Sequence, residues 1–407
     1  MIRRLFYFFL VVGPLVLMGC SLGPSMMRAN RMTYNDALQF TERQELLLNI
    51  VRLRYNEGPE FLATSSISTQ FTIDLGASAG GTIGDEQLQR TELLNIGGAV
   101  GYSERPTITF TPRNEKEFSQ QLISPIELEI IHLLVNYGWD IDRVLRLTAE
   151  GINGIRNSTV REDPSDNYDL QLRQFAELVR QFERLQQLGM LEISLEKEET
   201  DVSGPISAEK IHSSDILEAK KNNHQLVYHA PSKTYQLKQI HRLPVLRFSR
   251  DAIEQPEFQR IAERLRLASN TQVYRLINAP GSQIKASETT HAFKDLLFST
   301  RSVLGTMAYL SQGVSVPNAH IEGGLVAHNQ RHEASNAIIS DLFAVKAQEE
   351  KPVNAGMAIP YKGFWFYIED NDISSRRTMG VLNSLVRLKI EATGTQNTPV
   401  LTLPVGR

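Results

Sequence analysis

A serine bounded by glycines is the first candidate for chemistry in this chain. Gly76-Ala77-Ser78-Ala79-Gly80 has the spacing of a nucleophile elbow, in which a serine stands exposed where a strand turns sharply into a helix. The next residues, Gly-Thr-Ile-Gly-Asp, are poor helix formers, and the alternating pattern around Ser78 continues without a break. The sequence therefore favours a structural role for these small residues, and a hydrolase that uses Ser78 or an unrecognised acid pair stays an alternative.

Two polar clusters have spacings that a metal ion requires. His328 and His332 lie four residues apart, but the glycines and the asparagine around them indicate a loop rather than the helix that such a pair needs. The acidic run 369–372 precedes a predicted helix and lacks the glycine and glutamate spacing of an EF-hand. There we expect Asp372 or Ser374 to cap the helix. Neither a metal site nor a cofactor is predicted.

The single cysteine, Cys20, offers a different chemistry. It follows an apolar run, Leu5 to Leu17, that begins directly after two arginines. A basic segment, a short apolar segment and a small residue before the cleavage point are typical of an export signal. The run is shorter than the roughly 20 residues that span a bilayer as a helix, and Gly13-Pro14 interrupt it. The sequence predicts a signal peptide, residues 1–19, rather than a membrane-spanning helix.

Leu17-Met18-Gly19-Cys20 resembles the lipobox of bacterial lipoproteins. The resemblance implies that Cys20 becomes the mature N-terminus and carries a diacylglyceryl thioether and an N-linked acyl chain such as palmitate. In lipoproteins, a residue other than Asp after the cysteine implies transfer to the outer membrane, and Ser21 stands there. We therefore expect a protein lipid-anchored to the outer membrane on its periplasmic side, with residues 20–33 as a tether. The resemblance covers only residues 1–20, and the mature chain resembles no characterised family.

Composition bounds the rest of the chain. Removal of residues 1–19 leaves 388 of the 407 residues, enough for one large domain or two to three ordinary ones. The formal net charge of −3 becomes −5 without Arg3 and Arg4, so no overall signature of nucleic-acid binding exists. No cysteine remains for a disulfide, and no second apolar stretch is long enough to span a membrane as a helix.

A long β-hairpin is predicted over residues 66–111. The alternate positions from Ile67 to Ile83, and again from Leu94 to Phe110, are mostly apolar, with small or polar residues between them. One interpretation is an oligomeric lipoprotein pore or secretion channel to which each subunit donates strands; membrane strands of about 9–11 residues are shorter than these. Asp74 and Pro106 lie inside the pattern, and an ordinary hairpin packed on helices fits equally well.

Helices and strands are then predicted to alternate without a βαβ fingerprint, which favours an α+β class. We expect a helix before the hairpin, a helical region up to residue 189, and a mixed α+β portion over 190–407. Residues 196–223 lack clear periodicity and are predicted to be a polar, exposed loop or insertion. The expected helices are 34–56 with Thr33 as N-cap, one beginning at Ser124-Pro125 and ending at Gly138, 140–155, 168–188, 256–268, 289–311 and 374–391. The expected strands are 191–195, 225–229, 234–239, 244–248, 272–277, 363–368 and 400–403.

A basic stretch, residues 219–250, contains no acidic residue. It is a candidate contact for anionic headgroups, an anionic envelope polymer or an acidic partner, although strand alternation alone also places cations on a solvated face. Its basic residues are Lys220, Lys221, Lys233, Lys238, Arg242, Arg247 and Arg250.

The pattern as a whole favours an interaction or assembly component over an enzyme. We expect partners among the membrane, other envelope proteins and further copies of the chain, and no nucleic acid. The oligomeric pore component and the envelope hydrolase remain the alternatives.

Overall fold

The structure is a computed structural model, described for residues 22–81, 94–112, 116–157, 167–222, 224–268, 271–279, 292–326 and 333–391. Helices and mixed sheets together give an α+β fold, as predicted. The chain divides into two compact units. We call residues 60–118 with 393–407 the hairpin unit, and residues 1–59 with 119–392 the body.

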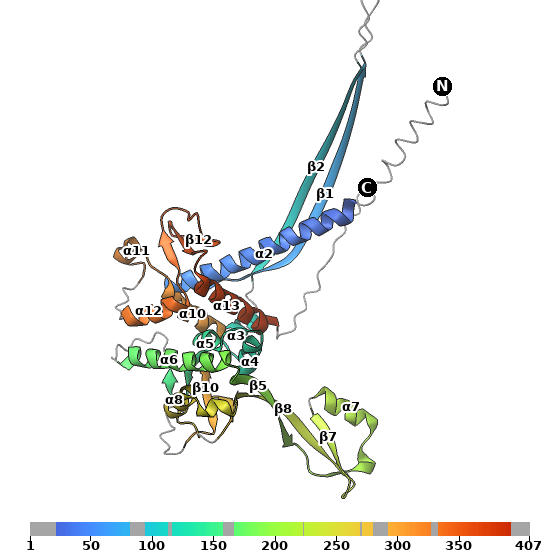
Figure 1. Cartoon of the computed structure of the whole chain (residues 1–407). Coiled ribbons are helices and arrows are strands. Elements are labelled where there is room, and N and C mark those ends of the chain that lie inside the picture. Colours follow the sequence, from blue (N-terminus) through green and yellow to red (C-terminus); the bar gives the residue numbers. More distant parts are fainter. Residues whose placement is uncertain are drawn as a thin grey trace, which may run out of the picture. The chain divides into compact units, whose positions relative to one another are not determined.

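In the hairpin unit, β1 (Leu62–Gly81) and β2 (Leu94–Pro112) form an antiparallel sheet of two strands, and they run side by side along their length (Figure 1). The register begins at Leu62 opposite Pro112 and ends at Gly81 opposite Leu94, with one irregularity near Thr64. β2 continues through Pro106 without a break. A proline is tolerated there because β2 is an edge strand of the described sheet.

The register of the hairpin joins like positions across the two strands. Ile73 is paired with Tyr102 and Leu75 with Val100, whereas Thr72 is paired with Ser103. Directly opposed residues of an antiparallel pair belong to the same face of the sheet. The pairing therefore collects most of the apolar positions of both sequences in one row, in which Phe71 is paired with Glu104, and the small or polar positions in the other.

The body contains a mixed sheet whose main path has the strand order β4-β3-β10-β9-β8-β5. β9 and β10 are parallel, and the other neighbours along this path are antiparallel. The strands are β3 (Ala149–Ile152), β4 (Ile155–Arg156), β5 (Leu191–Asp201), β8 (Thr234–Phe248), β9 (Val273–Asn278) and β10 (Asp295–Thr300).

The first residues of β8 pair with β6 (Ile206–Ser207) and β7 (His224–His229), and α7 (Ser213–Lys221) lies beside β7 (Figure 1). We call β5, β6, α7, β7 and this half of β8 the arm. A second sheet of the body has the order β11-β13-β12, formed by Lys346–Gln348, Phe364–Ile368 and Met357–Tyr361.

Helices pack around the main sheet and on one another. They are α2 (Leu22–Arg54), α4 (Leu128–Asn136), α5 (Ile141–Thr148), α6 (Asn167–Gln187), α8 (Pro256–Leu265), α10 (Val303–Leu310), α11 (Asn318–Glu322), α12 (Glu333–Leu342) and α13 (Ile373–Glu391), while α3 (Lys116–Ile123) crosses the division between the units. α6 confirms the predicted helix, because its stripe of Phe175, Leu178, Val179, Phe182 and Leu185 is fully buried.

Two predicted helix ends are confirmed by their local geometry. Gly138 follows α4 with a φ of +92°, and Trp139 donates a backbone hydrogen bond to the Leu134 carbonyl, as in a glycine-terminated helix. At the start of α13, Asp372 accepts a hydrogen bond from the Ser375 backbone N–H at 3.0 Å, which is an N-cap.

Several sequence-based boundaries are wrong. α2 begins at Leu22 and passes through Thr33, so Thr33 is not its N-cap. Ser124 does not cap α4, because Pro125 bridges to Ser302 and the helix begins at Leu128. The helix predicted over 140–155 ends at Thr148, where the chain turns into β3 and β4.

Two larger errors concern element type. Residues 196–222 form the second half of β5, β6 and α7 rather than an irregular loop. In the segment 289–311, Asp295–Thr300 is the strand β10 and the helix begins only at Val303. Pairing of β10 with both β9 and β3 overrides the helical spacing of its leucines and phenylalanine.

Arg301 joins many of these elements at one point of the core. Its side chain is almost completely buried and donates hydrogen bonds to the carbonyl oxygens of Arg146 (2.8 Å), Leu147 (3.1 Å) and Asn157 (2.6 Å). Its guanidinium also lies 4.1 Å from the centre of the Tyr309 ring. A cation is favourable at this place, because the first two carbonyls belong to the C-terminal turn of α5.

We predict that Arg301→Lys lowers the free energy of unfolding by about 3 kcal/mol, because a single ammonium replaces a planar fork that reaches three buried carbonyls. Urea denaturation measures the change. Arg242→Lys, at an exposed position of β8, is the matched control and should be silent. Equal stability of the two variants would contradict the role given to Arg301.

Candidate functional site

Some predicted residues lie outside the described residues: Leu17, Met18, Gly19, Cys20, His328, His332 and the predicted strand 400–403. Ser78 lies inside β1 opposite Gly97, and the strand continues to Gly81. The strand-to-helix turn of a nucleophile elbow is therefore missing at Ser78 in the described hairpin.

The basic stretch lies mostly on the arm, facing an acidic strand. Arg247 of β8 forms ion pairs with Glu192 (3.3 Å) and Glu196 (2.5 Å) of β5. Lys238 likewise pairs with Glu199 (3.4 Å) and with an aspartate at the end of β5 (3.8 Å). The other basic residues of the stretch are exposed and form no ion pair within the part of the chain that the structure describes: Lys220, Lys221, Lys233, Arg242 and Arg250. Those five remain available for an anionic surface.

A cavity of about 400 Å³ in the body is lined largely by charged side chains. We call it the charged cavity; its lining comes from α5, α6, α12 and α13 and consists of Asp142, Arg143, Arg146, Arg180, Glu183, Arg184, Gln187, Asp341 and Ser374. Arg146, which is 3% exposed, lies between Asp142 (3.6 Å) and Asp341 (3.5 Å). Arg180 also reaches Asp341, at 3.3 Å.

Burial sets the electrostatics of the charged cavity. It raises the pKa of Asp142 against the opposing effect of the arginines, Arg146 foremost. The pKa of Glu183 is raised by burial and by the nearby Asp142, whereas burial lowers the pKa of Arg143. Arg143 donates hydrogen bonds to the Ser374 carbonyl (2.9 Å) and to a threonine hydroxyl of α13. The charges thus cross-link four helices, although the buried atoms Asp142 Oδ1, Arg143 Nε and Arg146 Nε have no hydrogen-bond partner.

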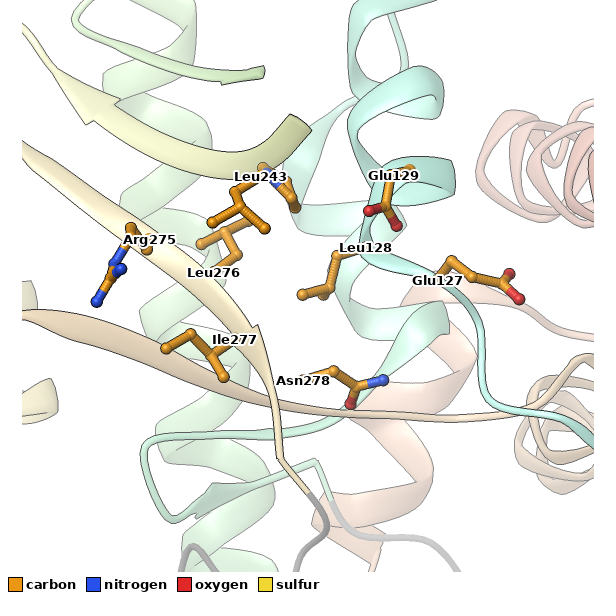
Figure 2. A pocket seen from close by; sticks show the side chains of 9 residues that line it. Glu127, Leu128, Glu129, Leu243, Arg275, Leu276, Ile277 and Asn278 are labelled. Carbon is orange, nitrogen blue, oxygen red and sulfur yellow. The ribbon is translucent and has the colours of Figure 1, made fainter. Parts of the chain in front are cut away.

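A second cavity, of about 310 Å³, opens between α4 and the strands β8 and β9. We call it the apolar fork; its lining is Glu127, Leu128, Glu129, Leu243, Pro244, Arg275, Leu276, Ile277 and Asn278. Figure 2 shows Leu128, Leu243 and Leu276 converging on its interior, while the Arg275 side chain points away from them. A concave apolar site with a few polar groups at its rim is suited to binding.

A buried histidine in the body has a structural role. The hydroxyl of Tyr55 lies 2.6 Å from His320 Nδ1, and His320 Nε2 lies 3.0 Å from the Lys362 carbonyl oxygen. Because a carbonyl only accepts, Nε2 carries the hydrogen and Nδ1 accepts from the tyrosine. Burial raises the pKa of Tyr55 to about 12. Both ring nitrogens are thereby occupied in joining α2, α11 and the second sheet.

Comparison with known proteins yields no identification. No protein-family model, no curated protein and no solved structure matches this chain. In the described part of the chain, no three His, Cys, Asp or Glu residues are grouped so that they could hold a metal ion. None of the described helices is both long and apolar enough to cross a membrane.

Sequence reasoning did not find either cavity. The charged residues of α5 and α6 recur at helical spacing, which is equally typical of a solvated face. The apolar fork had one signal, Pro244, which stands inside the strand β8 where the sequence analysis placed a strand start. Pro244 has no N–H to donate to β9, so the ladder of β8 with β9 ends there, while the pairing of β8 with β5 continues through it.

We predict a pH effect from the charged cavity. Because the pKa of Asp142 is raised in the folded state, that state binds its proton more readily than the unfolded chain does, and stability falls as pH rises through the window above the ordinary carboxyl pKa. Asp142→Asn should make this fall shallower at pH values above about 4. Urea midpoints against pH measure the slope. Glu322→Gln, at an exposed position, should leave the slope unchanged; an unchanged slope in Asp142→Asn would contradict the assignment.

Proposed function

We propose that this chain is a lipid-anchored component of an assembly at the bacterial outer membrane, and that copies of the chain associate through the hairpin unit. The observation that supports this proposal is the length of β1 and β2, 20 and 19 residues, in a sheet of only two described strands. Twenty extended residues reach about 66 Å. An isolated two-stranded hairpin is at best marginally stable in water, so such length calls for a partner.

The free edges of the hairpin favour other strands as that partner. Each strand pairs along one edge with the other, and no described residue pairs with either outer edge. Long unpaired edges are templates for strand pairing, and closure into a ring removes them. A second copy offers the same two edges, so repeated pairing around a closed ring satisfies every hairpin in the same way.

The two rows of the hairpin suit a barrel strand that has lipid on one face and water on the other. One register row is mostly apolar, with pairs such as Ile73–Tyr102 and Leu75–Val100, although Glu104 lies in it opposite Phe71, and the other row is rich in Gly, Ser and Thr. Barrel strands in membranes alternate in this manner over about 9–11 residues. β1 and β2 are about twice that length, so the proposed shared structure extends beyond a bilayer.

The membrane attachment rests on the N-terminal segment. The resemblance of residues 17–20 to a lipobox supports lipidation of Cys20, and several acyl chains hold a protein firmly at a membrane. The proposed location is the periplasmic side of the outer membrane. The exposed cations of the arm, such as Arg242 and Arg250, are proposed contacts for anionic groups of the envelope.

An envelope hydrolase receives no comparable support. Ser78 has no turn to present it, and the described body offers no nucleophile with an adjacent base in either cavity. The remaining alternative, a hairpin that packs on helices of the same chain, is separated by the following test.

We predict that the purified full chain forms a closed oligomer in detergent, measured by size-exclusion chromatography with light scattering. Ile73→Lys, in the apolar row, should abolish the oligomer, because a lysine facing lipid near the bilayer centre costs about 2–4 kcal/mol per subunit. Thr72→Lys, in the other row, is the matched control and should retain it. Amide protection of 67–102 in a monomer would contradict assembly through the hairpin.

We predict that Cys20→Ser abolishes acyl labelling and leaves the signal segment uncleaved, because only the thiol forms the thioether. Metabolic labelling with palmitate in a bacterial host measures the effect. Ser21→Ala, one residue on, should still be labelled. Absence of palmitate from the wild-type protein would show that the lipoprotein assignment is wrong.

A further inference from the structure

The apolar fork has the size and lining of a socket for a small apolar group. Leu128 of α4, Leu243 of β8 and Leu276 of β9 converge on a cavity of about 310 Å³ (Figure 2). This volume is at the lower end of ligand pockets. The fork therefore suits one or two aliphatic side chains rather than a large ligand.

The charges at the rim of the fork are unequal. Arg275 forms ion pairs with acidic residues of β10 (2.9 Å) and β5 (3.6 Å). Glu127 is bonded to the buried Lys389 of α13. Glu129 is exposed, and it has no ion-pair partner among the described residues. The uncompensated charge at the rim is thus negative.

Helix α7 of the arm carries the complementary features on its outer face. The helix lies against β7, and its buried residue is Ala219. On nearly the opposite side Leu217 is 64% exposed. Lys220 and Lys221 project within about 60° of Leu217 around the helix, and Glu218 about 100° away. Both lysines are exposed and form no ion pair with a described residue. The outer face of α7 is therefore one aliphatic side chain flanked by two unpaired cations.

The arm holds α7 away from the fork of its own chain. β5 and β8 pair without a register shift along the whole of β5, so the strand that contains Leu243 continues into the arm with no break in its pairing. The pairing of β8 with β7, against which α7 lies, begins only at Gln239. Figure 1 shows α7 apart from α4. An α7 that enters a fork must therefore belong to another copy of the chain.

We propose that α7 of one copy docks on the apolar fork of a second copy. Leu217 enters the space between Leu128 and Leu243, and Lys221 lies beside Glu129. Opposite charges at the rim then fix the register of an apolar contact. Because each copy carries α7 and the fork at different places, the contact is head-to-tail, and contacts of this type close into rings.

This inference rests on the proposed association of copies and names a second contact between them. One helix of nine residues covers much less than the roughly 1,200 Å² of a stable interface. The contact therefore forms between copies that another interface already holds close together, where the effective concentration is high.

Cysteine cross-linking between copies of the full chain in detergent tests this inference. Leu217→Cys in one chain and Leu243→Cys in a second, tagged chain should give a cross-linked dimer under mild oxidation. Each variant alone should give no more dimer than the wild-type chain, which reports any reaction of Cys20, the only native cysteine. Ile373→Cys is the matched control for Leu217→Cys, because Ile373 is equally exposed (67%) but belongs to α13. It should not cross-link to Leu243→Cys.

Charge reversal tests the pairing at the rim. Lys221→Glu in the Leu217→Cys chain, or Glu129→Lys in the Leu243→Cys chain, should lower the rate of cross-linking about tenfold. The two reversals together should restore the rate, because the charges are then opposite again. Lys233→Glu, at an exposed position between β7 and β8, should leave the rate unchanged.

The inference is overturned if the dimer does not form, or if Ile373→Cys cross-links as readily as Leu217→Cys. It is also overturned if the combined reversal does not restore the rate, since α7 then faces lipid or a different protein. Light scattering separates this inference from the proposed function. An oligomer without the cross-linked dimer overturns the contact between α7 and the fork alone, whereas the dimer without a larger oligomer contradicts association through the hairpin alone.

Discussion

The body is organised around one buried cation. Arg301 lies between β10 and α10, and its guanidinium donates hydrogen bonds to carbonyls at the end of α5 and after β4. Its own backbone bonds to Thr148 on one side and to Ile126 on the other, so the segment that leads into α4 is fixed at the same place. A guanidinium buried in this way is costly to desolvate, and this cost is offset only when several acceptors are arranged around it. That requirement makes the positions of α4, α5, α10 and the β3–β4 turn interdependent.

The fixed position of α4 has a direct consequence for the rest of the body. Glu127 at its start is bonded to Lys389 in the last turns of α13, and His132 reaches the Ile193 carbonyl of β5 at 3.0 Å. The helix is thereby anchored at both the helical layer and the sheet. Its residue Leu128 then forms one wall of the apolar fork, which lies between α4 and the strands β8 and β9. Core electrostatics and the geometry of a surface cavity are linked through one short helix.

The sequence was informative at several points where local chemistry decides the structure. The apolar stripe of α6, the glycine after α4 and the aspartate before α13 each act within a few residues, and each prediction is confirmed. Residues 295–300 failed because their strand exists only through β9 and β3, which are distant in sequence. Neither Arg301 nor the charged cavity was predicted, since a single arginine carries no periodic signal and its acceptors are backbone carbonyls.

The extent of α2 changes the mechanics of the proposed anchor. The sequence suggested a tether over residues 20–33, but α2 is helical from Leu22 to Arg54, 33 residues or about 50 Å. Its last turns are packed into the body, where Leu47, Ile50 and Val51 are fully buried. With acyl chains on Cys20, such a helix acts as a stiff rod clamped at one end, whose length sets the reach between lipid and body. An anchor of this kind holds the body at a set distance from the membrane, whereas a flexible tether would leave that distance variable.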